Sequence, residues 1–265
     1  MPSVLVVPTY QEAENVDRLL RAVRAASPEL DILIVDDNSP DGTGKIAEAV
    51  GDELGRVEVL HRPGKAGLGA AYRHGFRHAL DQGYDVVVQM DADFSHDPEV
   101  LPVLLDAVAQ GADVAVGSRY VPGGSVPNWT WLRRQLSHWG NAYARVMLRL
   151  RLQDATTAFR AYRAEVLERI DIDGTTANGY LFQIETAFRL SMAGVTVVEV
   201  PITFVDRVAG SSKMAVVRTM AETELRVTWW GLSLRAPRMT RRFRGTGPGR
   251  YAESLIRPTG PPRAH

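Results

Sequence analysis

The fold is decided by the stretch VVVQMDAD, residues 86–93, in which an uncharged run ends in two carboxylates. Comparable β-branched or apolar runs occupy residues 3–8, 31–35, 57–60 and 114–117. Near-continuous apolar runs are typical of parallel strands that are buried on both faces. Apolar residues with helical spacing separate the runs, at residues 16–23 and 100–108. This alternation predicts an α/β fold with a mostly parallel sheet and crossover helices.

The second half of the chain is less regular. Helical patterns are predicted at residues 136–149, 164–170, 182–192 and 214–232, and a strand-like stretch at residues 196–205. The 214–232 pattern is amphipathic, with apolar residues that include Leu225, Trp229 and Leu232. Such a helix packs on the core or lies on a bilayer surface, and the sequence leaves both open.

Composition limits the class of protein. The chain has 265 residues, 31 basic and 31 acidic residues, and no cysteine. The absence of cysteine excludes disulfides, thiolate metal sites and thiol nucleophiles, and fits a cytoplasmic location. The longest run without a charged residue is residues 120–132. A spanning helix needs about 20 apolar residues, so we expect the chain not to cross a membrane alone.

The charges are unevenly distributed along the chain. Residues 235–265 hold eight arginines and one acidic residue, a local charge of +7, which leaves −7 on residues 1–234. The same segment is rich in proline and glycine, so we predict a folded domain at 1–234 and a disordered basic tail at 235–265. The tail either solubilises the protein or is attracted to an anionic membrane surface. It has no recognisable nucleic-acid-binding motif, and we expect no nucleic acid partner.

Acidic residues follow three of the first four predicted strands, at the sheet edge where the carboxyl ends of parallel strands meet. They are Glu12, then Asp36, Asp37 and Asp41, then Asp91 and Asp93. Asp91 and Asp93 are two positions apart on an extended segment, so their side chains point the same way and can share one hard divalent cation. A nucleotide diphosphate is the natural third ligand. A solvated loop is the alternative for this pair.

Asp36 or Asp37 either accepts hydrogen bonds from a ribose or base or belongs to a turn.

An ordered set of motifs across residues 3–232 resembles the polyprenol monophosphomannose synthases, or dolichol-phosphate mannosyltransferases, which are inverting family 2 glycosyltransferases of GT-A fold. The motifs are PTYQE, IVDDNSPDG, GKAGLGAA, MDADFSHDPE, GSRY, FQIE and PITFVDRVAGSSKM. The resemblance implies that mannose passes from GDP-mannose to a polyprenyl phosphate, giving a β-linked product. It also implies that Asp91 and Asp93 hold Mg2+ or Mn2+ on the donor diphosphate. The donor nucleotide site that it implies consists of Pro8, Tyr10, Glu12, Val35, Asp37, Ala92 and Asp93.

A lipid phosphate is already an anion near neutral pH, so it needs positive charge and orientation rather than a strong general base. The resemblance assigns these tasks to basic residues at phosphate-binding positions, namely Arg119, Arg133, Arg207 and Lys213. With Asp91 and Asp93 they form the expected catalytic set. Asp154 and Glu185 are expected to position the sugar, the acceptor or the arginines, with a structural salt bridge as the alternative.

One departure from the family pattern concerns the loop that carries Asp91 and Asp93, called the metal loop below. Ser95 stands where the family often has a glutamine, so the resemblance gives no metal ligand there. His96 is interpreted as a loop histidine rather than a ligand. The resemblance further implies a peripheral protein at the cytoplasmic face of the membrane, with a separate integral membrane protein as partner.

Two other functions stay open at this point. One is a polyprenyl-phosphate glucosyltransferase that uses UDP-glucose or another sugar nucleotide. The other is a non-catalytic phosphate-binding regulator, because ILIVDD resembles the acidic pocket of a receiver domain. The length of the chain and its second acidic strand end disfavour the regulator.

Overall fold

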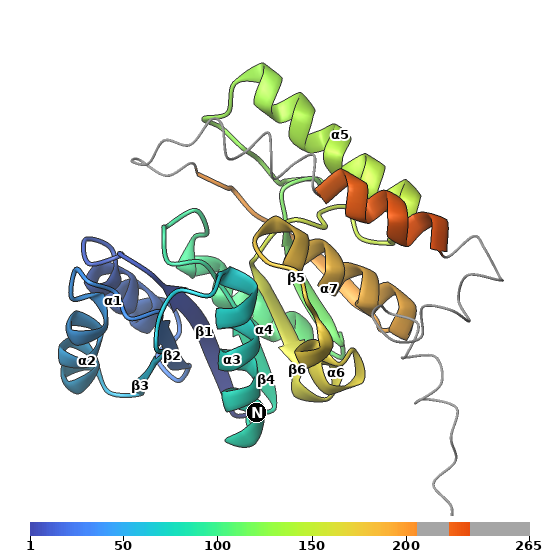
Figure 1. The fold of residues 1–265 in the computed structure, drawn as a ribbon. Helices are drawn as coiled ribbons and strands as arrows, with labels where there is room; N and C mark the ends of the chain where they lie inside the picture. Colours follow the sequence, from blue (N-terminus) through green and yellow to red (C-terminus); the bar gives the residue numbers. More distant parts are fainter. Residues whose placement is uncertain (206–222, 234–265) are drawn as a thin grey trace, which may run out of the picture.

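The computed structural model describes residues 1–205 and 223–233 (Figure 1). Its sheet has the strand order β3-β2-β1-β4-β6-β5-β7. The strands are β1 (Ser3–Thr9), β2 (Asp31–Asp36), β3 (Val57–His61), β4 (Val86–Gln89), β5 (Val114–Ser118), β6 (Arg160–Arg163) and β7 (Val197–Pro201). Every neighbouring pair is parallel except the two that β6 makes, with β4 and with β5. The predicted α/β fold with a mostly parallel sheet is therefore confirmed.

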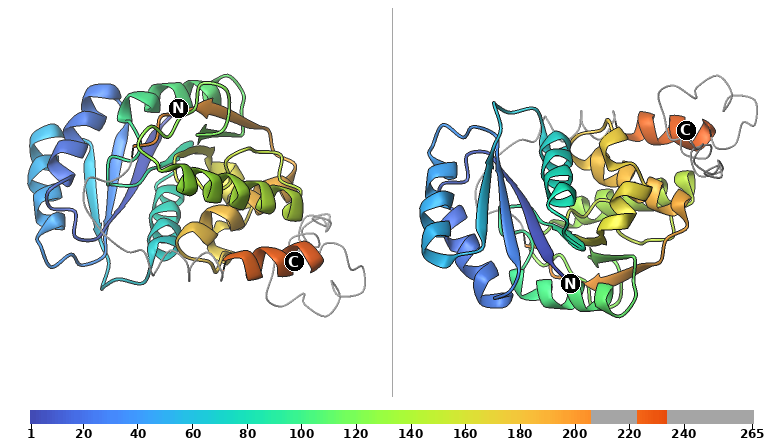
Figure 2. Two further views of the ribbon diagram at one scale, coloured as in Figure 1. Left: turned by 90° about the horizontal axis from the view of Figure 1, so that it is seen from above. Right: turned by 90° about the horizontal axis from the view of Figure 1, so that it is seen from below.

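Helices cover both faces of the sheet (Figure 2). One face carries α1 (Val16–Ala26), α2 (Thr43–Leu54) and α4 (Leu101–Ala109). The other carries α3 (Leu68–Asp81), α6 (Ala164–Arg169) and α7 (Tyr180–Ala193). The long helix α5 (Trp131–Leu148) lies beside the helix of residues 223–233 in Figures 1 and 2, and the Tyr143 hydroxyl is 2.6 Å from Thr228 Oγ1. Short 3-10 turns occupy Pro98–Val100 and Ile172–Gly174.

The central strands are buried on both faces because successive side chains point to opposite sides. Val4 and Val6 of β1 belong to the core under α3 and α7, whereas Leu5 and Val7 belong to the core under α1, α2 and α4. All four side chains are at most 2% exposed. This double burial explains why these strands appear in the sequence as continuous apolar runs.

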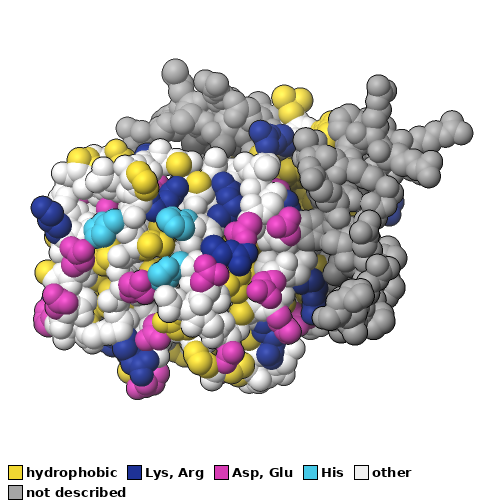
Figure 3. All heavy atoms as spheres, turned by 60° about the horizontal axis from the view of Figure 1, so that its bottom comes forward, with side chains coloured by type: hydrophobic (Ala, Val, Ile, Leu, Met, Phe, Trp, Pro, Cys, Tyr) yellow, Lys and Arg dark blue, Asp and Glu magenta, His cyan; other side chains and the backbone are white. Residues whose placement is uncertain are grey.

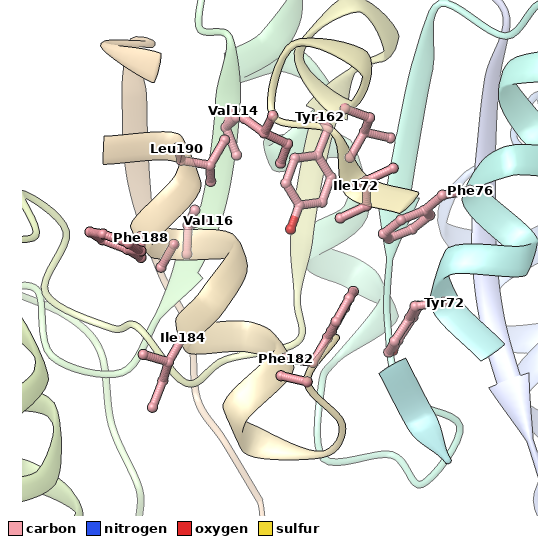
Figure 4. Close-up of a cluster of buried hydrophobic side chains, with 14 of the residues drawn as sticks. Tyr72, Phe76, Val114, Val116, Tyr162, Ile172, Phe182, Ile184, Phe188 and Leu190 are labelled. Atoms are coloured by element: carbon pink, nitrogen blue, oxygen red, sulfur yellow. The ribbon is translucent and has the colours of Figure 1, made fainter. Parts of the chain in front are cut away.

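Aromatic rings join α3, α7 and the sheet in the first of these cores (Figure 4). Tyr72 stacks on Phe182 with ring centroids 5.8 Å apart, and Phe76 meets Tyr162 edge-on at 5.9 Å. Such offset-stacked and edge-on pairs are the favoured aromatic geometries. They fix α3 and α7 against the sheet, directly below the strand ends that carry the acidic residues.

Two elements differ from the sequence-based prediction. The strand β6 was not predicted because its sequence, RAYR, lacks an apolar run. Its Arg160 is nevertheless fully buried, and the guanidinium donates to the backbone oxygens of Gln183 at 3.2 Å and Ala155 at 2.9 Å. Helix α5 begins at Trp131 rather than residue 136, because the Thr130 side chain caps it by accepting a hydrogen bond from the Arg133 amide at 3.4 Å.

The helix of residues 223–233 is the described part of the predicted 214–232 helix. Its core contacts are Val227 and Trp230, and Trp230 stacks on Phe188 with centroids 6.1 Å apart. Leu225 and Leu232, from the predicted apolar face, are 72% and 53% exposed. The helix thus packs on the core through one side and presents apolar residues outward from another. Residues 214–222 and the predicted tail at 235–265 lie outside the described residues.

No helix within the described residues is both long and apolar enough to span a membrane. The face turned forward in Figure 3 mixes basic and acidic side chains without a continuous area of one sign.

Candidate active site

Asp91 and Asp93 follow β4 at the carboxyl edge of the sheet, in the loop between β4 and α4. Asp91 Oδ1 accepts a hydrogen bond from the Tyr72 hydroxyl at 2.7 Å, and Asp93 Oδ1 accepts one from the Ser95 amide at 3.0 Å. Burial, followed by the charge of Asp91, raises the pKa of Tyr72 well above its usual value. Tyr72 therefore remains a neutral donor that holds the Asp91 carboxylate in place.

The donor atoms of Asp91 and Asp93 fit a hard divalent cation, because both supply carboxylate oxygens. Within residues 1–205 and 223–233, no group of three or more His, Asp or Glu side chains gathers in the geometry of a metal site. Two carboxylates without a protein cage are typical of a Mg2+-like ion that completes its shell with phosphate oxygens and water. The pair can therefore hold a cation that is shared with a bound diphosphate.

The expected nucleotide residues lie where β1 and β2 end. Pro8 and Val35 are buried partners in the parallel ladder between these strands. The partly buried Tyr10 follows, and the Lys65 ammonium lies 4.1 Å from the centre of its ring. Glu12 is also partly buried, and one carboxylate oxygen accepts from the Asn15 side chain at 2.7 Å. Ala92, between the two metal-loop aspartates, is buried.

The two aspartates at the end of β2 have different roles. Asp36 is buried and accepts hydrogen bonds from the Thr9 hydroxyl at 3.1 Å and the Ser39 amide at 3.0 Å. Asp36 therefore fixes the loop after β2 to the end of β1. Asp37 instead forms an ion pair with Arg62, which follows β3. Both members of this pair are nearly buried, so Arg62 adds a cation beside the expected nucleotide residues, and the sequence prediction did not include it.

Arg119 follows β5 and is held by Asp154, which precedes β6. Two side-chain hydrogen bonds join them, from Nε to Oδ2 and from Nη2 to Oδ1, each 2.7 Å long. The Arg119 amide also donates to Asp154 at 3.1 Å, and Thr156 accepts from Nη2 at 2.6 Å. Burial acts to raise the pKa of Asp154, but the charge and hydrogen bonds of Arg119 lower it below its usual value. The pair is therefore ionised, and the guanidinium has a fixed orientation.

Aromatic rings surround Arg119 and bring it close to Arg133 on α5. The guanidinium carbon of Arg119 lies 5.5 Å from the Trp129 ring centre and 5.2 Å from that of Phe204. The guanidinium carbon of Arg133 lies 4.4 Å from the same Trp129 ring. Two of the expected phosphate-binding arginines thus meet at one tryptophan.

A pocket of about 490 Å³ opens beside this cluster. The residues that line it come from the loop after β5 and from the first turns of α5: Arg119, Tyr120, Gly124, Ser125, Val126, Pro127, Arg134, Gln135 and His138. Arg119 and Arg134 bring positive charge to this lining, so the pocket suits an anionic group.

Glu185 lies in α7 and is buried. Its carboxylate accepts from the amides of Thr176 at 3.1 Å and Ala177 at 3.0 Å, and from Arg189 at 3.0 Å. The contact with Arg189 is an ion pair, which is the kind of structural salt bridge given above as the alternative role of Glu185. Arg207 and Lys213, the remaining expected phosphate ligands, lie outside the described residues.

Sequence reasoning did not single out Tyr72 and Arg62, and it did not predict the burial of His96. Tyr72 and Arg62 hold the aspartates, but they belong to other elements and no local pattern marks them. His96 is in a loop as expected, yet it is only 2% exposed and packs between the rings of Phe159 at 5.1 Å and Phe204 at 5.5 Å. Burial lowers the pKa of His96 to about 4. The acidic motif that precedes His96 is typical of an exposed loop, so sequence analysis did not predict this burial.

Comparison with known proteins supplies independent findings. Residues 4–171 match the family model described as glycosyl transferase family 2. A polyprenol monophosphomannose synthase of Mycolicibacterium smegmatis is 50% identical over 237 residues, which cover 89% of each chain. An undecaprenyl-phosphate mannosyltransferase of Micrococcus luteus is 49% identical over 235 residues, which cover 89% of this chain and 96% of that one.

Solved structures with much lower identity share the fold. Glucosyl-3-phosphoglycerate synthase from Mycobacterium tuberculosis superposes with a TM-score of 0.61 at 19% identity, covering 86% of this chain and 80% of that one. A mannosyltransferase from Pyrobaculum calidifontis, solved with GDP-Man and Mn2+, also gives 0.61 at 18% identity, covering 89% and 64%.

Proposed function

The chain belongs to glycosyltransferase family 2, and we propose that it transfers mannose from GDP-mannose to a polyprenyl phosphate, releasing GDP. Its fold is the GT-A fold of that family. The single observation that carries the proposal is that β4, β6 and β5 place Asp91, Asp154 and Arg119 along one sheet edge. A donor site with carboxylates thereby adjoins an acceptor site with arginines.

Donor binding is assigned to the ends of β1, β2 and β4. Pro8, Tyr10, Glu12, Val35 and Asp37 line the nucleoside side, with Ala92 and Asp93 beside the diphosphate. Asp91 and Asp93 would hold Mg2+ or Mn2+, which when bound neutralises the charge that grows on the leaving diphosphate. Tyr72 keeps the Asp91 carboxylate oriented through its 2.7 Å hydrogen bond.

Acceptor binding is assigned to the basic residues beyond β5. Arg119 receives the lipid phosphate in an orientation fixed by Asp154, and Arg133 adds a second guanidinium across Trp129. By family resemblance, Arg207 and Lys213 complete the phosphate contacts. Asp154 acts through Arg119, while Glu185 supports the loop at residues 176–177.

The reaction is an in-line displacement at the anomeric carbon. A lipid phosphate oxygen forms the new bond to that carbon as the bond to the GDP oxygen breaks, which inverts the configuration to β. Because the attacking oxygen is already anionic, no proton has to be removed, and the residues contribute positioning and charge stabilisation.

A lipid acceptor requires access to a membrane, and α5 suits that task. Leu132, Trp139 and Val146 are spaced by seven residues on one side of this helix and are 61–69% exposed. Leu225 and Leu232 add exposed apolar side chains on the neighbouring helix. We therefore place the protein peripherally on the cytoplasmic face of the membrane, with the basic segment 235–265 attracted to anionic lipid or to an integral membrane protein.

A donor panel tests the proposed function. The full chain is incubated with a short-chain polyprenyl phosphate in detergent, Mg2+ or Mn2+, and radiolabelled GDP-mannose or UDP-glucose. We expect lipid-linked label only from GDP-mannose, and none after addition of EDTA. Transfer from UDP-glucose at a comparable rate would favour the glucosyltransferase, and absence of transfer from every sugar nucleotide would refute the enzymatic assignment.

A further inference from the structure

Phe204 is a half-buried residue after β7 whose ring contacts three parts of the proposed site. The ring lies edge-on to His96, with centroids 5.5 Å apart, and edge-on to Trp129 at 5.7 Å. The guanidinium carbon of Arg119 lies 5.2 Å from the ring centre. One side chain therefore contacts both the loop that carries Asp93 and the arginine assigned to the acceptor.

Backbone hydrogen bonds fix the segment that carries this ring. The Phe204 amide donates to the Ser125 oxygen at 2.9 Å, and the Val205 amide donates to the Ser95 oxygen at 3.3 Å. The hydroxyls of Ser125 and Thr203 are 3.0 Å apart. The segment is thus bonded both to the loop after β5 and to the metal loop, so its position depends on both.

His96 is the residue of the metal loop that the Phe204 ring contacts. Neither ring nitrogen of His96 has a hydrogen-bond partner within the described residues, although the side chain is buried. Unpaired buried polar atoms are unfavourable, so stability alone does not explain a histidine between Phe159 and Phe204. A role in positioning accounts for a histidine at this place, whereas apolar packing does not.

We propose that Phe204 and His96 form an aromatic link that sets the position of the acceptor arginine relative to the metal loop. The inference rests on the proposed function, since it concerns the distance between the donor and acceptor phosphates. Both are positioning residues, which act through Arg119 and through the loop of Asp91 and Asp93. A displacement of about 1 Å between reacting groups can lower a rate by on the order of 100-fold, so such a link has a large kinetic effect.

The test replaces the ring while keeping an apolar side chain. In Phe204→Leu, we expect kcat to fall by roughly 10- to 100-fold, with the Kd of Mn2+ and GDP, measured by calorimetry, within about twofold of wild type. Phe204→Tyr keeps the ring and should retain most of kcat. Phe188→Leu is the matched control, because Phe188 is a buried ring that stacks on Trp230, which is not assigned to the site. It should lower Tm while leaving kcat within about twofold.

A double-mutant cycle provides a readout that general destabilisation would not reproduce. If His96 and Phe204 act together through one link, the double variant His96→Leu with Phe204→Leu should lose little more kcat than Phe204→Leu alone. Independent losses that multiply would overturn the proposal, as would a normal kcat for Phe204→Leu or an equal kcat loss in Phe188→Leu.

The wild-type control separates this inference from the proposed function. If the wild type uses another sugar nucleotide, the donor assignment fails, and the variants are compared on that nucleotide instead. A persistent kcat deficit there would support the link, and its absence would refute it. If the wild type transfers no sugar, the proposed function and the link that rests on it both fall.

Discussion

Replacing His96 by leucine should remove a defined part of the loss of folding stability that this protein undergoes as the pH falls. Burial lowers the pKa of His96 to about 4 in the folded chain, whereas an exposed histidine titrates near 6.5. The unfolded chain therefore takes up a proton first as the pH falls. The stability tied to His96 is present above about pH 6.5 and is lost progressively as the pH falls towards 4.

The magnitude follows from these two values. Between pH 7.5 and pH 5.0, proton uptake by unfolded His96 should lower the free energy of unfolding by about 2 kcal/mol. Urea unfolding, followed by far-UV circular dichroism at both pH values, measures the loss. The wild type should lose about 2 kcal/mol more than His96→Leu. His74→Leu, which alters an exposed histidine of α3, should keep the wild-type loss because His96 is intact. Equal losses in the wild type and His96→Leu would refute the reasoning.

Three further predictions concern the carboxylates and the tail. Asp91→Asn and Asp93→Asn should keep the wild-type Tm but lower transfer by on the order of 100-fold or more, because each weakens the metal site; full activity of either variant in a radiolabel assay would contradict the assignment. Asp154→Ala should lower the free energy of unfolding by about 3–5 kcal/mol in urea titrations, because it leaves the buried Arg119 charge unpaired; a loss below about 1 kcal/mol would show that this pair is not buried. Deleting residues 235–265 should preserve transfer to a short acceptor in detergent but weaken binding to anionic vesicles in flotation assays, and unchanged binding at low salt would exclude a lipid role for the tail.

Sequence patterns predicted those strands whose own residues form a continuous apolar run. The runs that became β1, β2 and β4 are apolar because both faces of these strands are buried, and the end of β4 places Asp91 and Asp93 at the edge where β1 and β2 also end. Strand β6 had no such signal, since the burial of Arg160 depends on backbone oxygens outside the strand, those of Ala155 and Gln183.

The helix of residues 223–233 shows a related limit. The amphipathic pattern selected Leu225 and Leu232, whereas Val227 and Trp230 make the core contacts because Phe188 offers a stacking surface. His96 is a similar case, because the two phenylalanines that bury it come from other segments. Pattern analysis identifies apolar residues but not the partner that a residue meets from far along the chain.

The reversed direction of β6 has a consequence for how enzymes of this type can diversify. Because β6 starts where its neighbours β4 and β5 end, Asp154 reaches the working edge from a late part of the chain, while the donor carboxylates come from the first hundred residues. Under the proposed assignment, sequence change in the later part of the chain alters the acceptor side and leaves the residues of the nucleotide side unchanged. A single antiparallel strand in this way brings a late part of the chain to the edge where the early carboxylates lie.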